Sequence, residues 1–253
     1  MATPESESFV RTFARGLRVI EVMGQSTGKQ TIAEISEAAE LPRTVVRRLL
    51  LTLTELGFVK FDDKDYWLTP KVLRLGMTYL YTLPFWRQSQ LILEELGTKV
   101  KQSCAIAVLD EMDIVYIQRF HTKRILATNP AIGSRLPAYA VSMGRVLLSG
   151  LPEPLLRDYL DKVELKKLTP RTNTEPKKLR QSIEQAREEG WAWVDSELDE
   201  AICGLAVPVR NQEGLIVAAV NVSLLAGEYT RKQAQAEFLP SLKLAASQLK
   251  ARG

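Results

Sequence analysis

Two polar side chains lie in a strongly apolar stretch, VAAVNVSLL at residues 217–225. Asn221 and Ser223 are two positions apart, and alternate residues of a strand point to the same side of a sheet. A polar group on so apolar a strand is hydrogen-bonded in the core, directed into a cavity, or exposed on an outward, solvated face. Gly204 begins the preceding strand, and its missing side chain lets a ligand approach the backbone closely. The pattern predicts a ligand cavity on one face of a sheet, with the solvated face as the alternative.

A second group of polar residues lies in GSRLPAYAVSMG, residues 133–144, which predicts a loop leading into a helix. Free backbone amides at a helix N-terminus bind anions. Arg135 adds a guanidinium that can hold a carboxylate through two hydrogen bonds. Tyr139, with Trp191 and Trp193, could stack on an aromatic ring. Taken singly, each tryptophan fits a core residue equally well, and Arg135 a surface residue.

A third group is basic and lies in LPRTVVRRLL, residues 41–50, at the start of a predicted helix. At the start of the second helix of a helix-turn-helix, arginine can pair bidentately with guanine, and threonine can contact a base edge or phosphate. The alternative is an ordinary helical hairpin with a solvated basic face. The residues expected to contact double-stranded operator DNA are Arg43, Thr44, Arg47, Arg48 and, from an earlier helix, Arg15.

Few residues are suited to catalysis or metal binding. Among 253 residues there is one histidine, His121 in a charged turn, which argues against a zinc site and a Ser-His-Asp triad. Cys104 and Cys203 lack metal or redox spacing, so we interpret them as reduced, buried thiols. The patterns GxGxxG, GxxxxGK[ST] and GxSxG are absent. We therefore expect no catalytic residues, no metal and no cofactor, although catalysis by carboxylates alone stays open.

The charge of the chain is distributed locally. The net charge is +4, yet residues 1–69 hold 9 Lys+Arg and 10 Asp+Glu, so the positive charge near the DNA-binding helix is confined to its arginines. We interpret the densest basic stretch, residues 162–180, as solvated surface, although such a patch can contact DNA non-specifically. No apolar run approaches the roughly 18 residues of a membrane span. The start of the chain lacks the form of a secretory signal, so we expect a cytoplasmic protein with no membrane partner.

The basic residues are positioned by two short predicted helices. Thr31 and Glu34 form a capping box that starts the first helix. Pro42 favours the first turn of the second helix and keeps the residue before it out of helical geometry. Gly57 is a natural stop.

A hairpin and one more helix complete the N-terminal domain. The aromatic runs 58–61 and 66–68 flank an acidic turn, which indicates a β-hairpin. A helix over about residues 9–23 fills the remaining side of the core. Three helices and a hairpin predict a winged helix-turn-helix over residues 1–69.

Residues 70–84 form the predicted linker helix. Its side chains are apolar on more than one side, so it needs a partner. A second copy of the chain is one candidate, because modules of this kind usually read two half-sites as symmetric dimers. Coverage by the second domain is the other. The apolar residues are Leu73, Leu75, Met77, Tyr79, Leu80 and Tyr81.

Residues 85–253 mix helical and strand patterns. The combination predicts an antiparallel sheet with helices on its flanks, and the whole chain therefore belongs to the α/β (α+β) class. One face of the sheet is free to form a ligand pocket. The expected strands are 104–109, 114–119, 124–128, 191–195, 205–210 and 215–223, with helices near 85–101, 140–148, 152–159, 175–189 and 230–250, and a loop over 129–137.

The chain resembles the IclR family of bacterial transcription regulators over nearly its whole length. The resemblance is carried by TIAEISEAAELPRTVVRRLLLTLTELGFV, GSRLPAYAVSMGRVLL and GLAVPVRNQEGLIVAAVNVS. The second motif and LTPRT look most like the branch that regulates protocatechuate and p-hydroxybenzoate catabolism. The resemblance implies a winged helix, a GAF-like effector domain over residues 85–253, a homodimer or tetramer, and a small carboxylate effector. It places the effector-binding pocket on Ser142, Met143, Asp195, Gly204, Asn221 and Ser223, to which we add Arg135, Tyr139 and Trp193.

The chain departs from the family pattern at several pocket positions. Relatives often carry serine or cysteine where this chain has Gly204, serine in place of Asn221, and glycine in place of Ala201. We expect a ligand-responsive transcription factor that senses an aromatic acid such as p-hydroxybenzoate or protocatechuate, a ligand class chosen mainly from the resemblance. The alternatives are a regulator of the same family that senses an aliphatic keto acid, an enzyme that uses the same cavity, and a DNA-binding protein without a ligand.

Overall fold

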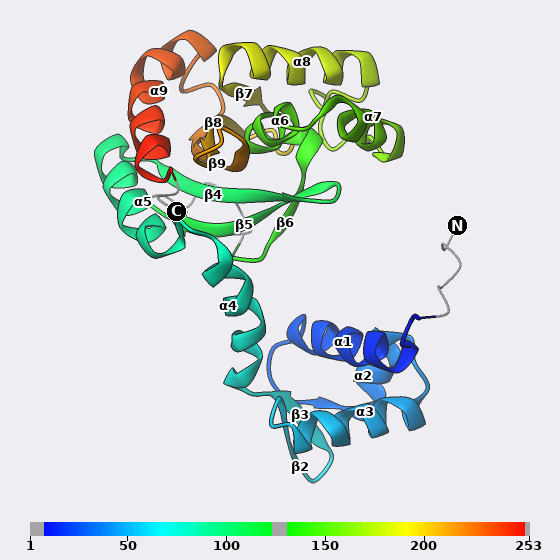
Figure 1. The fold of residues 1–253 in the computed structure, drawn as a ribbon. Helices are drawn as coiled ribbons and strands as arrows, with labels where there is room; N and C mark the ends of the chain where they lie inside the picture. Colours follow the sequence, from blue (N-terminus) through cyan, green and yellow to red (C-terminus); the bar gives the residue numbers. More distant parts are fainter. Residues whose placement is uncertain (1–7, 123–130, 251–253) are drawn as a thin grey trace. The chain divides into compact units, whose positions relative to one another are not determined.

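The computed structural model describes residues 8–122 and 131–250. The chain divides into two compact units, Met1–Leu80 and Tyr81–Gly253 (Figure 1). The predicted strand at 124–128 and the start of the predicted loop at 129–137 lie outside the described residues. In the part that is described, no helix is long and apolar enough to cross a membrane.

The N-terminal unit is a winged helix-turn-helix. Thr31 caps α2, since its hydroxyl accepts from the Glu34 amide at 3.4 Å while the Glu34 carboxylate accepts from the Thr31 amide at 2.7 Å. Glu40 adopts the left-handed conformation (φ 56°) and turns the chain before Pro42. The buried residues Val19, Ile35, Val46 and Leu50 join the three helices in one core. The elements are α1 (Arg11–Gly24), β1 (Gln30–Thr31), α2 (Ile32–Ala39), α3 (Arg43–Glu55), β2 (Val59–Asp62) and β3 (Asp65–Leu68).

The wing is an antiparallel hairpin with a two-residue turn. Asp62 pairs with Asp65, and Asp63 in the turn has a φ of 54°, as hairpin turns of this length require. Phe61 stacks on Tyr66 across the two strands with 5.8 Å between ring centroids. The central strand β3 also pairs with β1, which ties the hairpin to the start of α2.

The linker comprises the 3-10 turn Pro70–Val72 and the helix α4 (Leu73–Thr82). Thr69 caps the turn by accepting from the Lys71 amide at 3.2 Å. Four apolar side chains of α4 are exposed. They are Leu73, Leu75, Tyr79 and Tyr81.

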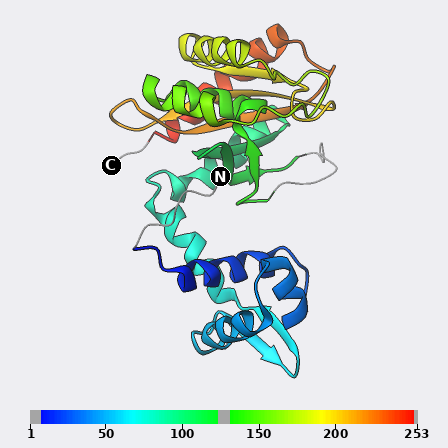
Figure 2. The same cartoon turned by 90° about the vertical axis from the view of Figure 1, so that its right-hand side faces the viewer.

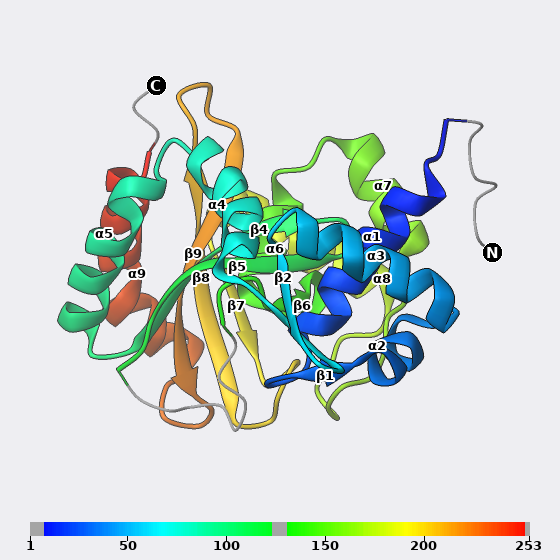
Figure 3. The ribbon, with the colours of Figure 1, turned by 90° about the horizontal axis from the view of Figure 1, so that it is seen from below.

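The C-terminal unit is built on a six-stranded antiparallel sheet of order β6-β5-β4-β9-β8-β7. One layer of helices contains α6, α7 and α8, and the other contains α5 and α9. In Figure 2 the yellow α8 and the teal α5 lie on opposite sides of the sheet, and Figure 3 shows the sheet between the two layers. The strands are β4 (Ser103–Asp110), β5 (Asp113–Phe120), β6 (Arg135–Pro137), β7 (Ala192–Asp195), β8 (Ile202–Arg210) and β9 (Ile216–Leu225). The helices are α5 (Trp86–Val100), α6 (Ser142–Ser149), α7 (Glu153–Lys162), α8 (Pro176–Glu189) and α9 (Arg231–Gln248). The predicted fold class is confirmed, but part of the predicted 129–137 loop is the strand β6.

Small residues make room for α6 on the sheet. Ala105, Ala107, Ala206 and Ala219 lie in one core cluster with residues of α6. The helix also approaches the 3-10 turn Ala138–Ala140 closely, because a Cβ on its Gly144 would lie 1.9 Å from the Ala138 carbonyl oxygen. These close approaches fix the start of α6 above β8 and β9.

A β-bulge in β5 changes which of its residues face α6. Opposite β4, Gln118 pairs with Ile106 and Tyr116 pairs with Ala107, so Ile117 is the extra residue. An extra residue reverses the alternation of side chains beyond it. Arg119, which pairs with Ala105, therefore faces the same side as Tyr116, although the two are three positions apart.

Ion pairs neutralise much of the basic 162–180 stretch, as expected of a solvated surface. Each pair lies within 4.0 Å and both partners are at least one third exposed, so water screens the charges and the pairs add little to the stability of the fold. The pairs are Lys162–Asp158, Lys166–Glu164, Arg171–Asp195, Lys178–Glu175 and Arg180–Glu153.

Candidate functional site

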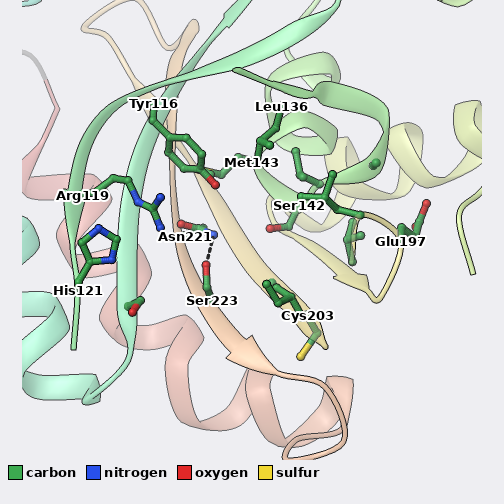
Figure 4. A pocket seen from close by; sticks show the side chains of 17 residues that line it. Tyr116, Arg119, His121, Leu136, Ser142, Met143, Glu197, Cys203, Asn221 and Ser223 are labelled. Atoms are coloured by element: carbon green, nitrogen blue, oxygen red, sulfur yellow. Dashed lines mark hydrogen bonds between the residues drawn. The ribbon is translucent and has the colours of Figure 1, made fainter. Parts of the chain in front are cut away.

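A cavity lies between the sheet and the start of α6 (Figure 4). It is lined by residues of all six strands, of the start of α6 and of the turn after β7. Five of the nine effector-site residues predicted from the sequence line it: Ser142, Met143, Gly204, Asn221 and Ser223. The rest of the lining consists of Ser103, Tyr116, Arg119, His121, Leu136, Ala140, Val141, Val194, Glu197, Leu198, Ile202 and Cys203.

Asn221 supplies a buried hydrogen-bond acceptor. Its Nδ2 donates to the Ser223 hydroxyl at 3.2 Å, consistent with two residues on the same side of β9. The residue is 5% exposed, and among the described residues its Oδ1 has no hydrogen-bond donor. An unsatisfied buried acceptor costs about 1–3 kcal/mol, so a ligand that donates to Asn221 recovers this free energy.

Gly204 lets α6 approach the sheet at the cavity. A Cβ at this position would lie 2.8 Å from the Ser142 hydroxyl and 3.7 Å from the Val222 carbonyl oxygen. Gly204 pairs with Ser223 across β8 and β9, so Ser142 sits over the same row of the sheet as Ser223. A larger residue at Gly204 would displace Ser142 and change the shape of the cavity.

Sequence reasoning missed the cationic side of the cavity. Arg119 lies over the Tyr116 ring, 4.6 Å from its centroid, and His121 follows on the same side of the strand (Figure 4). Desolvation lowers the pKa of Arg119, and burial together with the charge of Arg119 lowers the pKa of His121. Desolvated charge in a cavity is characteristic of functional sites. The bulge at Ile117 hides this arrangement from a reading based on strict alternation.

The cavity is small and has a partly apolar wall of Leu136, Met143, Val194 and Leu198. The space open to the centres of water molecules is about 60 Å³. This volume is smaller than the roughly 150 Å³ of a cavity that binds benzene. A ligand with a single ring therefore fits only if side chains that line the cavity move apart.

Arg135 lies outside the cavity. It is 43% exposed on β6, where its guanidinium pairs with Asp110 and, at 3.0 Å, with Asp113. The hydrogen bond and charge of Asp110 raise the pKa of Arg135, so its charge is already engaged at the end of the β4–β5 hairpin. The structure does not bring this residue together with Ser142 or Asn221.

The remaining predicted pocket residues also lie elsewhere. On β7, Val194 lines the cavity, so by alternation Trp193 and Asp195 lie on the other side of the strand, in a separate depression with Arg171. Asp195 accepts from Arg171 at 2.6 Å. The Tyr139 hydroxyl donates to the Lys166 carbonyl at 2.9 Å.

Cys203 lines the cavity as a thiol. Burial, and to a smaller extent the charge of Asp195, raises its pKa to about 12. Its sulfur lies 3.7 Å from the Leu224 carbonyl oxygen. A thiol with so high a pKa is protonated at neutral pH and is a poor nucleophile. In the described residues, no cluster of three or more histidine, cysteine or acidic side chains could hold a metal ion.

The N-terminal unit presents the predicted DNA-contacting side chains to solvent. Val46, Leu49 and Leu50 of α3 are buried against the core. The opposite face is polar and its backbone is fixed by the Pro42 entry turn. Arg43, Thr44, Arg47, Arg48 and, on α1, Arg15 are exposed.

Comparison with known proteins identifies both units. The family model described as the bacterial transcriptional regulator IclR C-terminal domain matches residues 77–251, and that of the IclR helix-turn-helix domain matches residues 12–63. The Pca regulon regulatory protein of Pseudomonas putida is 41% identical over 240 residues, which cover 94% of this chain and 82% of that protein. The p-hydroxybenzoate hydroxylase transcriptional activator of Acinetobacter baylyi is 30% identical over 250 residues, covering 97% and 92%.

A solved structure with a ligand is also similar. The inducer-binding domain of a double mutant of the PobR transcription factor from Acinetobacter, in complex with 3-hydroxybenzoic acid, superposes with a TM-score of 0.60 at 29% identity. The match covers 65% of this chain and 96% of that one. The helix-turn-helix, the six-stranded domain and these matches lead to one conclusion: the chain belongs to the IclR family of bacterial transcriptional regulators and is a DNA-binding regulator rather than an enzyme.

Proposed function

We propose that this regulator senses a hydroxylated monocyclic aromatic acid, of the p-hydroxybenzoate or protocatechuate type, and controls genes of aromatic-acid catabolism in response. The observation that carries the proposal is that one small cavity contains both a guanidinium and a buried acceptor that has no donor among the described residues. These features are Arg119, with His121 beside it, and Asn221 Oδ1.

The carboxylate of the ligand binds on the side of Arg119. A guanidinium can donate two hydrogen bonds to a carboxylate, and partial burial reduces the screening of the charge by water. Desolvation lowers the pKa of Arg119, and a bound anion favours the charged form of the guanidinium. This role replaces the one expected of Arg135, whose charge is paired with Asp110 and Asp113.

The ring hydroxyl supplies the donor that Asn221 Oδ1 lacks. A ligand with a carboxylate but no hydroxyl leaves this acceptor unsatisfied. The ring packs against Tyr116, Met143 and Val194, while Ser142 and Ser223 offer further hydroxyls. The names of the relatives agree with this ligand class, since one activates p-hydroxybenzoate hydroxylase transcription and another was crystallised with 3-hydroxybenzoic acid.

The winged helix reads the operator through α3, with Arg47 and Arg48 at the major groove and Arg15 on the DNA backbone. The exposed apolar side chains of α4 and α1 pair with a second copy, giving a homodimer or tetramer that binds two half-sites. Effector binding changes the equilibrium between arrangements of the paired winged helices that differ in their fit to the operator.

Calorimetry with the full chain tests the ligand class. The ligands are 4-hydroxybenzoate, protocatechuate, 4-methoxybenzoate, benzoate, glyoxylate and pyruvate. We expect micromolar binding of at least one hydroxybenzoate and at least about tenfold weaker binding of 4-methoxybenzoate, which cannot donate to Asn221. Asn221→Ala should remove this difference between hydroxyl and methoxy ligands, and Arg47→Ala should leave it unchanged.

The response to the ligand is measured on DNA. Operator sequences are selected from a random duplex pool, and binding is followed by fluorescence anisotropy with and without ligand. We expect the hydroxybenzoate that binds in calorimetry to change operator affinity. If the benzoates give no heat while glyoxylate or pyruvate binds, the regulator senses an aliphatic keto acid and the proposed ligand class is wrong.

A further inference from the structure

One charged side chain of the effector domain is almost completely buried and has no role in the mechanism described so far. Arg145 on α6 is 2% exposed and is among the largest fully buried side chains of the described residues. Desolvation lowers its pKa, and the charge of Glu197 raises it. A buried cation is costly unless it is paired and hydrogen-bonded.

Arg145 is held on three sides. Its Nε donates to the Tyr139 carbonyl at 2.8 Å, its Nη1 to the Ser182 hydroxyl of α8, and its Nη2 to the Glu197 carboxylate at 2.8 Å. The same Glu197 oxygen accepts from the Asn173 amide at 3.0 Å. The guanidinium thus connects α6, whose first residues line the cavity, to the turn after β7 that closes it.

Glu197 is a wall residue of the cavity and carries a negative charge. Its side chain is 15% exposed. Figure 4 shows its carboxylate directed away from Ser142 and Asn221. The carboxylate accepts from Arg145 Nη2 at 2.8 Å. A carboxylate turned the other way would lie in the space that the effector occupies.

We propose that Arg145 sets the charge selectivity of the effector site by holding the Glu197 carboxylate out of the cavity and neutralising it, so that an anionic effector is accepted. Arg145 is a positioning residue in this role. The inference rests on the proposed function only because it takes the effector to be a carboxylate. It holds equally for an aromatic and for an aliphatic carboxylate.

The size of the effect follows from Coulomb's law. Two like charges about 6 Å apart repel by about 2–3 kcal/mol at an effective dielectric constant of about 20, which weakens binding about a hundredfold, or about tenfold where the open side of the cavity screens them. A neutral ligand of the same shape feels no such repulsion. The ratio of the dissociation constants of an acid and its amide therefore isolates the contribution of charge.

The test compares 4-hydroxybenzoate with 4-hydroxybenzamide by calorimetry on the full chain. In Arg145→Met we expect the affinity for the acid to fall about ten- to a hundredfold relative to the amide. Adding Glu197→Gln to Arg145→Met should restore the acid-to-amide ratio to within about threefold of the parent. A ratio that stays low in the double variant, or that does not change in Arg145→Met, overturns the proposal.

Two further variants keep the test decisive if Arg145→Met does not fold. Glu197→Gln alone removes the acid while the cation stays, so the ratio should be unchanged or favour the acid more. A shift against the acid overturns the proposal. The matched control is Arg180→Met, which breaks an ion pair with Glu153 on the surface of the same domain and should leave the ratio unchanged.

The proposed function and this inference fail in different ways. A parent chain that binds no hydroxybenzoate refutes the former, and the ratio is then measured with pyruvate and pyruvamide. A crystal structure of ligand-free Arg145→Met gives a readout without any ligand. In that structure the Glu197 carboxylate should point into the cavity, and an unchanged position overturns the proposal.

Discussion

The assignment of the effector's charge partner is tested by a pair of substitutions, Arg119→Gln and Arg135→Gln. Both remove one positive charge from the effector domain and keep a polar side chain. Arg119 lines the cavity over Tyr116, whereas Arg135 lies outside it and pairs with Asp110 and Asp113. The two variants therefore have the same net charge and differ in where the charge is lost.

The expected losses of effector affinity in the two variants differ by at least about fivefold. A hydrogen bond to a charged group contributes about 1.5–3 kcal/mol, so Arg119→Gln should weaken binding of 4-hydroxybenzoate by roughly ten- to a hundredfold. Arg135→Gln breaks an exposed pair, which costs about 0–1 kcal/mol of folding free energy and no ligand contact. Its effector affinity should stay within about twofold of the parent.

The assay is calorimetric titration, with urea unfolding as the control for stability. The midpoint of unfolding shows whether loss of the Arg119 side chain and of its contact with the Tyr116 ring also destabilises the fold. Loss of binding in a destabilised Arg119→Gln protein would not count as support. Strong loss of effector binding in Arg135→Gln, with binding by Arg119→Gln unaffected, would refute Arg119 as the charge partner of the effector. Arg135, which the sequence predicts for this role, would then be the partner.

Three further predictions concern DNA, assembly and pH. The double substitution Arg47→Ala and Arg48→Ala should weaken operator binding by about 1–3 kcal/mol for each side chain that reads a base. Effector binding measured by calorimetry should stay unchanged. If the folded variant binds the operator as tightly as the parent, the assignment of these arginines to DNA contact is wrong. Sedimentation at micromolar concentration should show a dimer or tetramer formed through residues 70–84 and the N-terminal unit, and a monomer with and without DNA would exclude it. Burial and the charge of Arg119 lower the pKa of His121, so this side chain is neutral at pH 7 and gains its proton only at a pH below 6.5. Because a bound carboxylate favours the protonated form, effector affinity should rise by up to about fivefold as the pH falls through the pKa of His121. The substitution His121→Gln should abolish this rise.

The sequence determined the elements whose formation depends on neighbouring residues. The capping box of Thr31 and Glu34, the turn before Pro42 and the hairpin of the wing are local, and the structure contains each of them. The shared direction of Asn221 and Ser223 follows from the two-residue repeat of a strand, and the two side chains are hydrogen-bonded. These features required no knowledge of distant contacts.

Only the tertiary structure decided which cation faces the cavity. Strict alternation along β5 would place Arg119 on the face opposite Tyr116, and the bulge at Ile117, which exists only through pairing with β4, reverses it. Likewise, the Arg135 guanidinium could bind a ligand carboxylate, but in the folded domain it is already paired with Asp110 and Asp113 of the β4–β5 hairpin. Strand register and the partners of a charged side chain depend on residues far apart in the sequence, so a reading of one segment at a time could not place them.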